Sequence, residues 1–164
     1  MPKYLIWFSI LAIFSSLAFS KEYLPKGCQS IALEGTDIHL KAHADHLLFL
    51  HNVSESEIWL GNRESAKLTV DMHPGGWSVL FIPSADANWR CVESQTGHEQ
   101  QVPCQSVIAL CQWPATAPNN VQFKNSLWLV ENQSIVVAKA YLQRMGWHFD
   151  KVGTKLSKQG VKNR

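Results

Sequence analysis

Residues 88 to 113 read NWRCVESQTGHEQQVPCQSVIALCQW and contain three of the four cysteines of the chain. Gly97 and His98 can form the two-residue turn of a β-hairpin, because glycine accepts the positive φ that such turns require. With that turn, Cys91 lies opposite Cys104 at a non-hydrogen-bonded pair, where side chains are closest. The stretch therefore predicts a hairpin closed by a Cys91–Cys104 disulfide, with residues 107–113 in its return arm.

The first twenty residues have the pattern of a secretory signal peptide. Lys3 supplies the positive charge, an apolar run follows, and Ala18 and Ser20 are small residues before a cut at Lys21. The run is shorter than the roughly 20 apolar residues of a transmembrane helix. We therefore expect a periplasmic or secreted protein that meets the membrane only transiently, with an uncleaved signal anchor as the alternative.

In an exported protein, the number of cysteines indicates how many disulfides can form. All four cysteines follow the expected cut, and an even number in an oxidising compartment predicts two disulfides. If Cys91 pairs with Cys104, the second bridge joins Cys28 to Cys111. One feature argues against the hairpin register: Pro103 would occupy a hydrogen-bonded position without an N–H to donate, which requires a bulge or an edge strand.

Short strand-like runs separated by turn residues recur at roughly ten-residue spacing, as in antiparallel sandwiches and barrels. Besides the hairpin, the expected strands are residues 38–43, 46–53, 57–60, 66–72, 77–82 and 127–130. Residues 21–35 and 114–120 are expected to be a loosely held lead-in and a loop.

The last expected element is a helix at about residues 134–146, with Ser134 as its N-cap and Gly146 as its stop. One stripe at helical spacing should face the sheet, made of Ile135, Ala138, Tyr141, Leu142 and Met145. The sequence thus predicts a mainly β domain at residues 21–150, an antiparallel β-sandwich or partly open barrel with one C-terminal α-helix and two disulfides.

Charge separates this domain from a basic tail. The formal net charge is +2, but residues 151–164 contain five bases and no acid, whereas residues 21–150 contain nine bases and thirteen acids. We expect the tail to be disordered and able to contact anionic surfaces. We expect no nucleic-acid partner, because an exported protein seldom meets one.

Histidines are the candidate metal ligands. His39, His43 and His46 are close in sequence, and His39 and His43 would share a face of one strand. Their spacing matches no fixed ligand pattern, and a half-exposed strand face is the alternative. The Cys–His–Met order of a blue-copper site is missing. Because no G-x-S-x-G or H-E-x-x-H pattern occurs, we expect no catalytic residues, no cofactor and no enzymatic activity.

The polar residues at the hairpin tip are the candidate partner contact. They are Gly97, His98, Glu99 and Gln100, and exposed loops of this kind often carry binding functions.

Three segments resemble the enhanced entry protein EnhB family, small exported proteins of intracellular Gram-negative bacteria. They are HLLFLHNVS at residues 46–54, GGWSVL at residues 75–80, and the C-x-E-S, G-H-E-Q, P-C and C-Q-W pieces of residues 91–113. The resemblance implies a virulence-associated part in host-cell entry or intracellular survival at the periplasm or envelope. It implies no enzymatic activity, cofactor or binding residues.

Three functions are therefore in view. The first is an exported, non-enzymatic binding protein with an unknown protein or envelope component as its partner. The second is a periplasmic enzyme inhibitor or chaperone of lysozyme-inhibitor type, which a hairpin tip projecting from a rigid sheet would favour. The third is a small metal-binding protein that uses its histidines.

Overall fold

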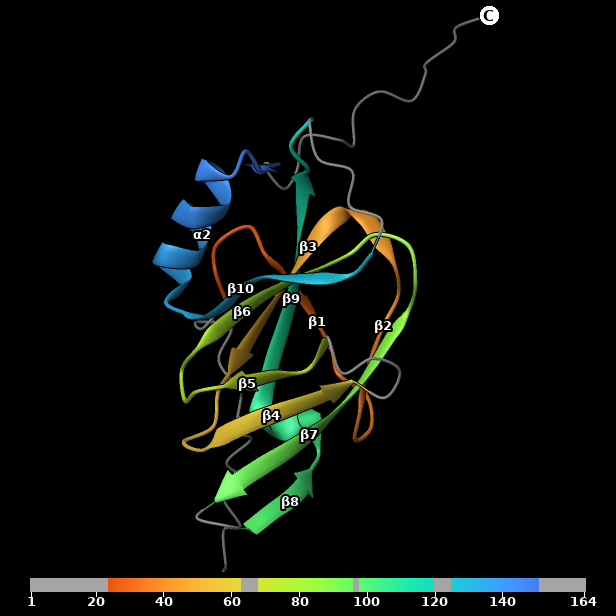
Figure 1. Cartoon of the computed structure of the whole chain (residues 1–164), viewed down its shortest axis with the longest axis vertical. Coiled ribbons are helices and arrows are strands. Elements are labelled where there is room, and N and C mark those ends of the chain that lie inside the picture. The colour runs from red at the N-terminus through yellow and green to blue at the C-terminus, as the bar shows by residue number, and fades with distance from the viewer. Residues whose placement is uncertain (1–23, 63–67, 96–97, 120–124, 151–164) are drawn as a thin grey trace, which may run out of the picture.

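The computed structural model describes residues 24–62, 68–95, 98–119 and 125–150. The expected signal peptide and basic tail lie outside the described residues. Two antiparallel sheets face each other, and Figure 1 shows β4 and β5 running across β9 in front of it. The predicted mainly β, antiparallel sandwich with two disulfides is confirmed.

One sheet has six strands and the other has five. The six-stranded sheet has the order β1 (Gln29–Ile31), β9 (Ile108–Thr116), β3 (His43–Asn52), β6 (Trp77–Ile82) and β10 (Leu127–Gln133), and β11 (His148–Phe149) also pairs with β9. The five-stranded sheet has the order β2 (Ile38–Leu40), β7 (Ala87–Gln95), β4 (Glu57–Asn62) and β5 (Val70–Met72), and β8 (His98–Val102) also pairs with β7.

Two apolar cores cover both faces of the six-stranded sheet. The first lies between the sheets and includes Leu50, Leu60 and Trp89, and the second lies on the outer face and includes Phe49 and Trp113. Strand β6 is buried at all six of its positions. A strand covered on both faces has apolar residues at successive positions instead of every second one, which explains the run WSVLFI.

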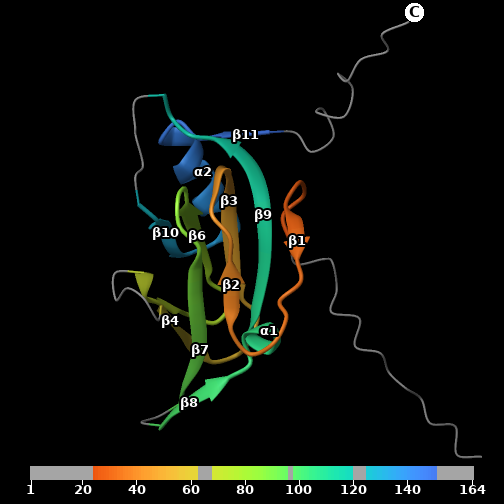
Figure 2. The ribbon, with the colours of Figure 1, turned by 90° about the vertical axis from the view of Figure 1, so that its right-hand side faces the viewer.

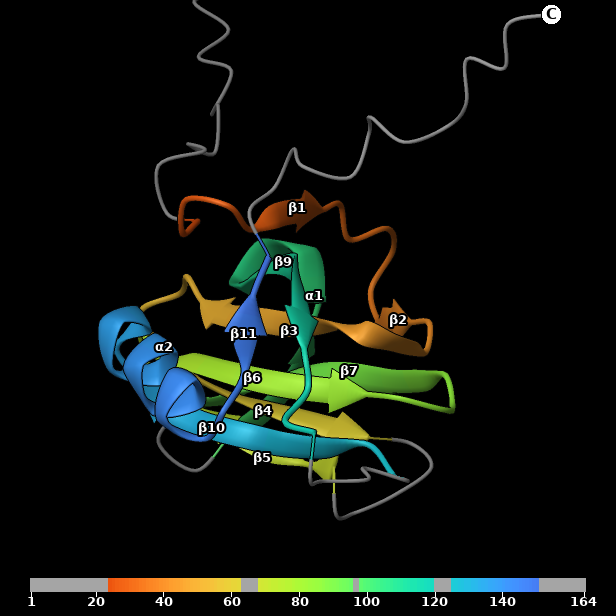
Figure 3. The ribbon, with the colours of Figure 1, turned by 90° about the horizontal axis from the view of Figure 1, so that it is seen from above.

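Helix α2 (Ile135–Arg144) packs against β6 and β10 and covers part of the outer core (Figure 3). Its predicted ends are confirmed: the Ser134 hydroxyl accepts a hydrogen bond from the Val137 amide at 3.3 Å, and Gly146 has a φ of 90°.

The buried face of α2 is narrower than the predicted stripe. Ala138 and Leu142 are fully buried, but Tyr141 and Met145 are 42% and 43% exposed. Trp147 directly after the helix packs edge-on to Phe81 with 5.0 Å between ring centroids. This indole is fully buried in the outer core, so burial continues beyond the end of the helix.

The hairpin differs from the prediction in register but not in its disulfide. Gln95 pairs with His98 and Cys91 with Val102, two residues away from the predicted partner. Cys104 is the first residue of a second, short helix, α1 (Cys104–Val107), and it still bonds to Cys91 with 5.2 Å between their Cα atoms.

Pro103 explains the shift. It has no N–H for the ladder, so β8 ends at Val102, and with φ −62° and ψ 122° Pro103 becomes the N-cap of α1. Because side chains alternate between the two faces of a strand with period two, a register shift of two residues leaves the side chain of Cys91 on the inward face of the sheet. The predicted return arm at residues 107–113 was wrong: β9 belongs to the opposite sheet.

Two segments that were expected to be irregular are strands. Residues 29–31 form β1 because the Cys28–Cys111 disulfide holds the chain against the open edge of β9, where Ser30 pairs with Cys111. Strand β9 continues through Pro114, whose carbonyl accepts a hydrogen bond from the Asp150 amide at 3.0 Å. The proline nitrogen faces that same edge, and the Asp150 carbonyl there accepts a hydrogen bond from the Trp113 indole N–H at 3.3 Å, so the missing proline N–H does not end β9.

Side chains of β10 connect the two sheets along one side, where a β7 side chain shares one of their acceptors. The indole N–H groups of Trp89 and Trp128 donate to the Leu68 carbonyl at 2.8 and 3.1 Å, and the Asn132 amide donates to the Asp71 carbonyl. These bonds hold β10 beside β5 and fix the end of the five-stranded sheet where Asp71 lies.

Candidate functional site

The β7–β8 hairpin extends beyond the opposite sheet and α1 (Figure 2). Three of the four residues predicted as a partner contact, His98, Glu99 and Gln100, are exposed on β8, and Gly97 lies outside the described residues. Because strand residues alternate between faces, Glu99 lies on one face of the hairpin and its two neighbours lie on the other.

Strand register brings Glu99 into line with residues of two further strands. Glu99 pairs with Ser94, and Ser94 pairs with Glu57 of β4, so the three lie side by side on the outer face of the sheet. In the next row, Asp71 of β5 pairs with Trp59 of β4. The five-stranded sheet thus gathers acidic side chains from β4, β5 and β8 around one tryptophan.

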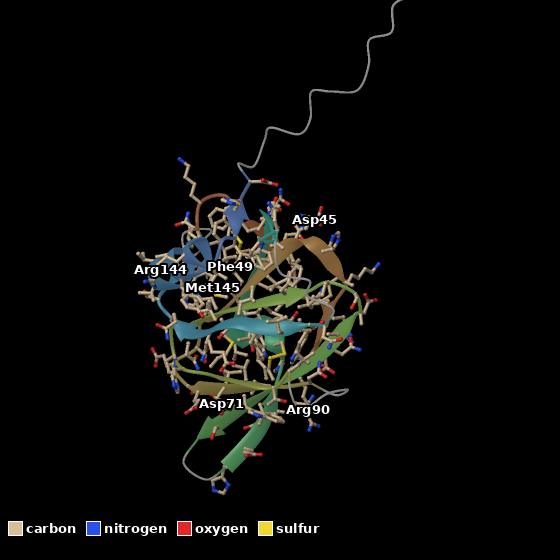
Figure 4. The ribbon with its side chains drawn as sticks, turned by 45° about the horizontal axis from the view of Figure 1, so that its top comes forward. Asp45, Phe49, Asp71, Arg90, Arg144 and Met145 are labelled. Carbon is tan, nitrogen blue, oxygen red and sulfur yellow. A yellow bond between two sulfur atoms is a disulfide. The ribbon has the colours of Figure 1, made fainter. Side chains whose placement is uncertain are left out.

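These residues line a pocket of about 250 Å³ on the outer face of the sheet. Its lining consists of Glu57, Trp59, Asp71, Val92, Ser94 and Glu99. We call it the Trp59 pocket. Figure 4 shows Asp71 and Arg90 on this part of the molecule, far from Asp45 at the other end.

Gly61 and Arg90 position the indole of Trp59. A Cβ atom on Gly61 would lie 2.4 Å from Cζ3 of Trp59, so the ring lies against the backbone of its own strand where no side chain stands. The guanidinium carbon of Arg90 lies 5.8 Å from the ring centroid, a cation–π contact. The wall of the pocket is therefore held on two sides.

Acidic groups dominate the pocket. Among the described residues its lining contains three carboxyl groups and no base, and two basic side chains lie beside it: Arg90 over the Trp59 ring, and His73, whose Nδ1 lies 3.6 Å from Oε1 of Glu57. An aromatic wall beside several carboxyl groups can bind a positively charged group through cation–π contact and charge-assisted hydrogen bonds.

Sequence reasoning found only Glu99 among these residues. The pattern EIWLGN contained a further signal, since Glu57, Trp59 and Gly61 alternate along one strand face. The pattern does not show that β4 pairs with β5 and β7, and this pairing is what brings Asp71 and Ser94 beside Glu57 and Trp59.

The histidines predicted as metal ligands are not gathered in one group. His39 and His43 were expected on one strand, but His39 lies on β2 and its Nδ1 is hydrogen-bonded to Oδ1 of Asn88, whereas His43 begins β3. The two strands are separate because the chain passes from the five-stranded sheet to the six-stranded sheet at residues 41 and 42. His43 and His46 do meet, with 4.9 Å between ring centroids, and Asp45 lies beside both. The hydrogen bond from His46 is the main cause that holds the pKa of Asp45 below its usual value.

Both predicted disulfides are formed, Cys28–Cys111 and Cys91–Cys104, which fits an oxidising compartment outside the cytoplasm. None of the helices within the described residues has the length and apolar composition needed to cross a membrane. Comparisons with protein-family models, with curated proteins and with solved structures found no match to this chain.

Proposed function

We propose that the protein is an exported, non-enzymatic binding protein that holds a positively charged group of its partner in the Trp59 pocket. The observation that supports this most directly is the convergence of Glu57, Asp71 and Glu99, from three different strands, beside one indole. Like charges that are brought together repel one another, and a cation supplied by the partner relieves that repulsion.

The size of the pocket favours a side chain over a larger ligand. Sites for drug-sized molecules have volumes of about 300–1,000 Å³, whereas the Trp59 pocket has about 250 Å³. A lysine ammonium or arginine guanidinium fits this volume and carries several N–H donors for the carboxylates of its lining. We therefore propose a protein partner that inserts one basic side chain.

The location of the partner is proposed from the sequence and the disulfides together. The signal-peptide pattern of residues 1–20 and the two bridges support export to the periplasm or beyond. The resemblance of residues 46–54, 75–80 and 91–113 to the enhanced entry protein family supports an envelope component or a host-cell protein as the partner, and virulence as the setting.

The test compares two double variants that change the net charge equally. Asp71→Asn/Glu99→Gln removes two acids of the pocket, and Glu34→Gln/Glu131→Gln removes two exposed acids elsewhere. NMR titration of the oxidised protein with short peptides that differ only in one Lys, Arg, Glu or Ala should shift the Trp59 indole signal with the basic peptides alone. The pocket variant should bind them at least about tenfold more weakly, a loss of about 1.4 kcal/mol.

The control variant should bind as the unmodified protein does. Equal weakening in both double variants would show that overall charge, not the pocket, attracts the peptides. Binding of the acidic or neutral peptide with the same affinity would overturn the proposal.

A second candidate is the enzyme inhibitor or chaperone of lysozyme-inhibitor type. The projecting β7–β8 hairpin favours it, because both faces of β8 are accessible and could enter a cleft (Figure 2). Hydrolysis of peptidoglycan by lysozymes, measured with and without the oxidised protein, tests it. Inhibition that is lost in His98→Ala but kept in Asp71→Asn would favour this candidate over the first.

A further inference from the structure

The start of β3 carries a second group of polar side chains, separate from the Trp59 pocket. Among the described residues, His43, Asp45 and His46 are the one set of three His, Cys, Asp or Glu side chains whose ligand atoms all lie within 4.8 Å of one another. We propose that these three residues bind a divalent transition-metal ion, with zinc as the best match. This inference goes beyond the binding of a cationic partner.

A bulge in β3 creates the arrangement. His43 pairs with Ile82 and Leu48 with Leu80, so β3 has three more residues than β6 between these pairs. In a regular strand Asp45 and His46 would point to opposite faces. The bulge turns them toward each other, as bulges next to functional sites often do, and Nδ1 of His46 lies 2.7 Å from Oδ1 of Asp45.

Strand pairing holds the backbone of the two histidine ligands in place. His43 is paired with β6 and His46 with Pro114 of β9, so both histidines stand on the sheet ladder. The Asp86 carboxylate accepts a hydrogen bond from the Ala42 amide at 2.9 Å, which holds the chain just before β3. Metal sites on rigid strands are better preorganised than sites on loops.

The distances agree with tetrahedral coordination. Ligand atoms about 2.0–2.1 Å from a tetrahedral zinc ion lie about 3.3–3.4 Å from each other. Nδ1 of His43 is 3.4 Å from Oδ1 of Asp45, and the ligand atoms of all three residues lie within 4.8 Å of one another; the hydrogen-bonded Asp45–His46 contact must lengthen and the imidazoles must adjust when the ion replaces the shared proton. The Asp45 side chain is 72% exposed, so its carboxylate can rotate to allow this.

The donor set indicates the kind of ion. Two imidazoles and one carboxylate suit zinc and copper, whereas magnesium and calcium prefer sites built from oxygen alone. The four cysteines do not compete with these residues for the ion, because all four are in disulfides and none is a free thiol. Three protein ligands leave a fourth position for water or for a donor from a partner.

The experiment is a calorimetric titration of the oxidised protein, prepared without a polyhistidine tag, with Zn²⁺, Cu²⁺ and Mg²⁺. We expect one Zn²⁺ or Cu²⁺ ion per chain and no Mg²⁺. His43→Ala, Asp45→Asn and His46→Ala should each weaken zinc binding at least about tenfold, because even loss of an outer-shell partner costs about 10–100-fold. His98→Ala removes an exposed histidine of β8 and should leave the affinity unchanged.

A second readout distinguishes a local site from scattered histidine binding. On addition of Zn²⁺ the ring proton signals of His43 and His46 should shift together in NMR spectra, while that of His98 should not. The Asp71→Asn/Glu99→Gln variant should bind zinc normally, which separates this inference from the Trp59 pocket. Zinc binding that survives His43→Ala and Asp45→Asn, both exposed positions, would overturn the proposal, as would the absence of any zinc binding.

Discussion

Removal of each disulfide in turn, with alanine at both of its cysteines, tests how the bridges stabilise the fold. The Cys28–Cys111 bridge joins residues 83 apart and the Cys91–Cys104 bridge residues 13 apart. If a bridge acts by restricting the unfolded chain, its contribution grows with the logarithm of the closed loop and is about 4.5 kcal/mol for the first and about 3 kcal/mol for the second. Cys28→Ala/Cys111→Ala should therefore lower the free energy of unfolding by about 1.5 kcal/mol more.

Core packing has the opposite effect on the two bridges: it should make removal of the Cys91–Cys104 bridge the more destabilising change. Cys91 and Cys104 are both fully buried in the core between the sheets, whereas Cys28 is only partly buried. Urea unfolding followed by tryptophan fluorescence measures both variants, and equal m values would show that the same surface is exposed on unfolding. A larger loss for Cys91→Ala/Cys104→Ala would refute the entropic reasoning and show that core packing determines the value of each bridge.

Two further predictions concern the Trp59 pocket and a buried histidine. In Gly61→Ala the new methyl group displaces the Trp59 ring, so basic peptides should bind more weakly in the NMR titration. The free energy of unfolding should fall by no more than about 1–3 kcal/mol, because the ring can swing outward. Unchanged peptide binding would show that the position of the ring does not matter. Burial lowers the pKa of His51, so below about pH 6.5 the unfolded chain takes up a proton that the folded chain resists, and stability falls as the pH drops toward the lowered folded value. The variant His51→Phe should show a smaller loss of stability between pH 7 and pH 5 in urea titrations, and an equal loss would mean that other groups cause it.

Local sequence chemistry was sufficient for the elements that depend on nearby residues. The cap and stop of α2 were predicted correctly, because Ser134 and Gly146 act within one helical turn. Strand β6 matched its predicted bounds, since its apolar run is confined between turn residues. Both disulfides were predicted, because Cys91 and Cys104 were expected to face each other in one hairpin and the remaining two cysteines had no other partner.

Edges and registers were beyond the sequence, because they depend on which strands meet. Residues 29–31 have no strand signal of their own and become β1 through pairing with β9. Pro114 indicated a loop, because the sequence does not show which neighbouring strand the nitrogen of a proline in a strand will face. The hairpin register changed because Pro103 could begin α1 as well as interrupt a ladder.

The two candidate sites differ in the same way. The sequence showed the exposed tip with Glu99 and the histidines His43 and His46, since residue types and short spacings are local properties. Only the tertiary structure brought Glu99 to the pocket of Trp59 and Asp45 beside both imidazoles, because strand pairing and a bulge determine which side chains share a face. Residue chemistry by itself thus determined a disulfide-bonded β scaffold, and the contacts between distant strands decided where its two candidate sites lie.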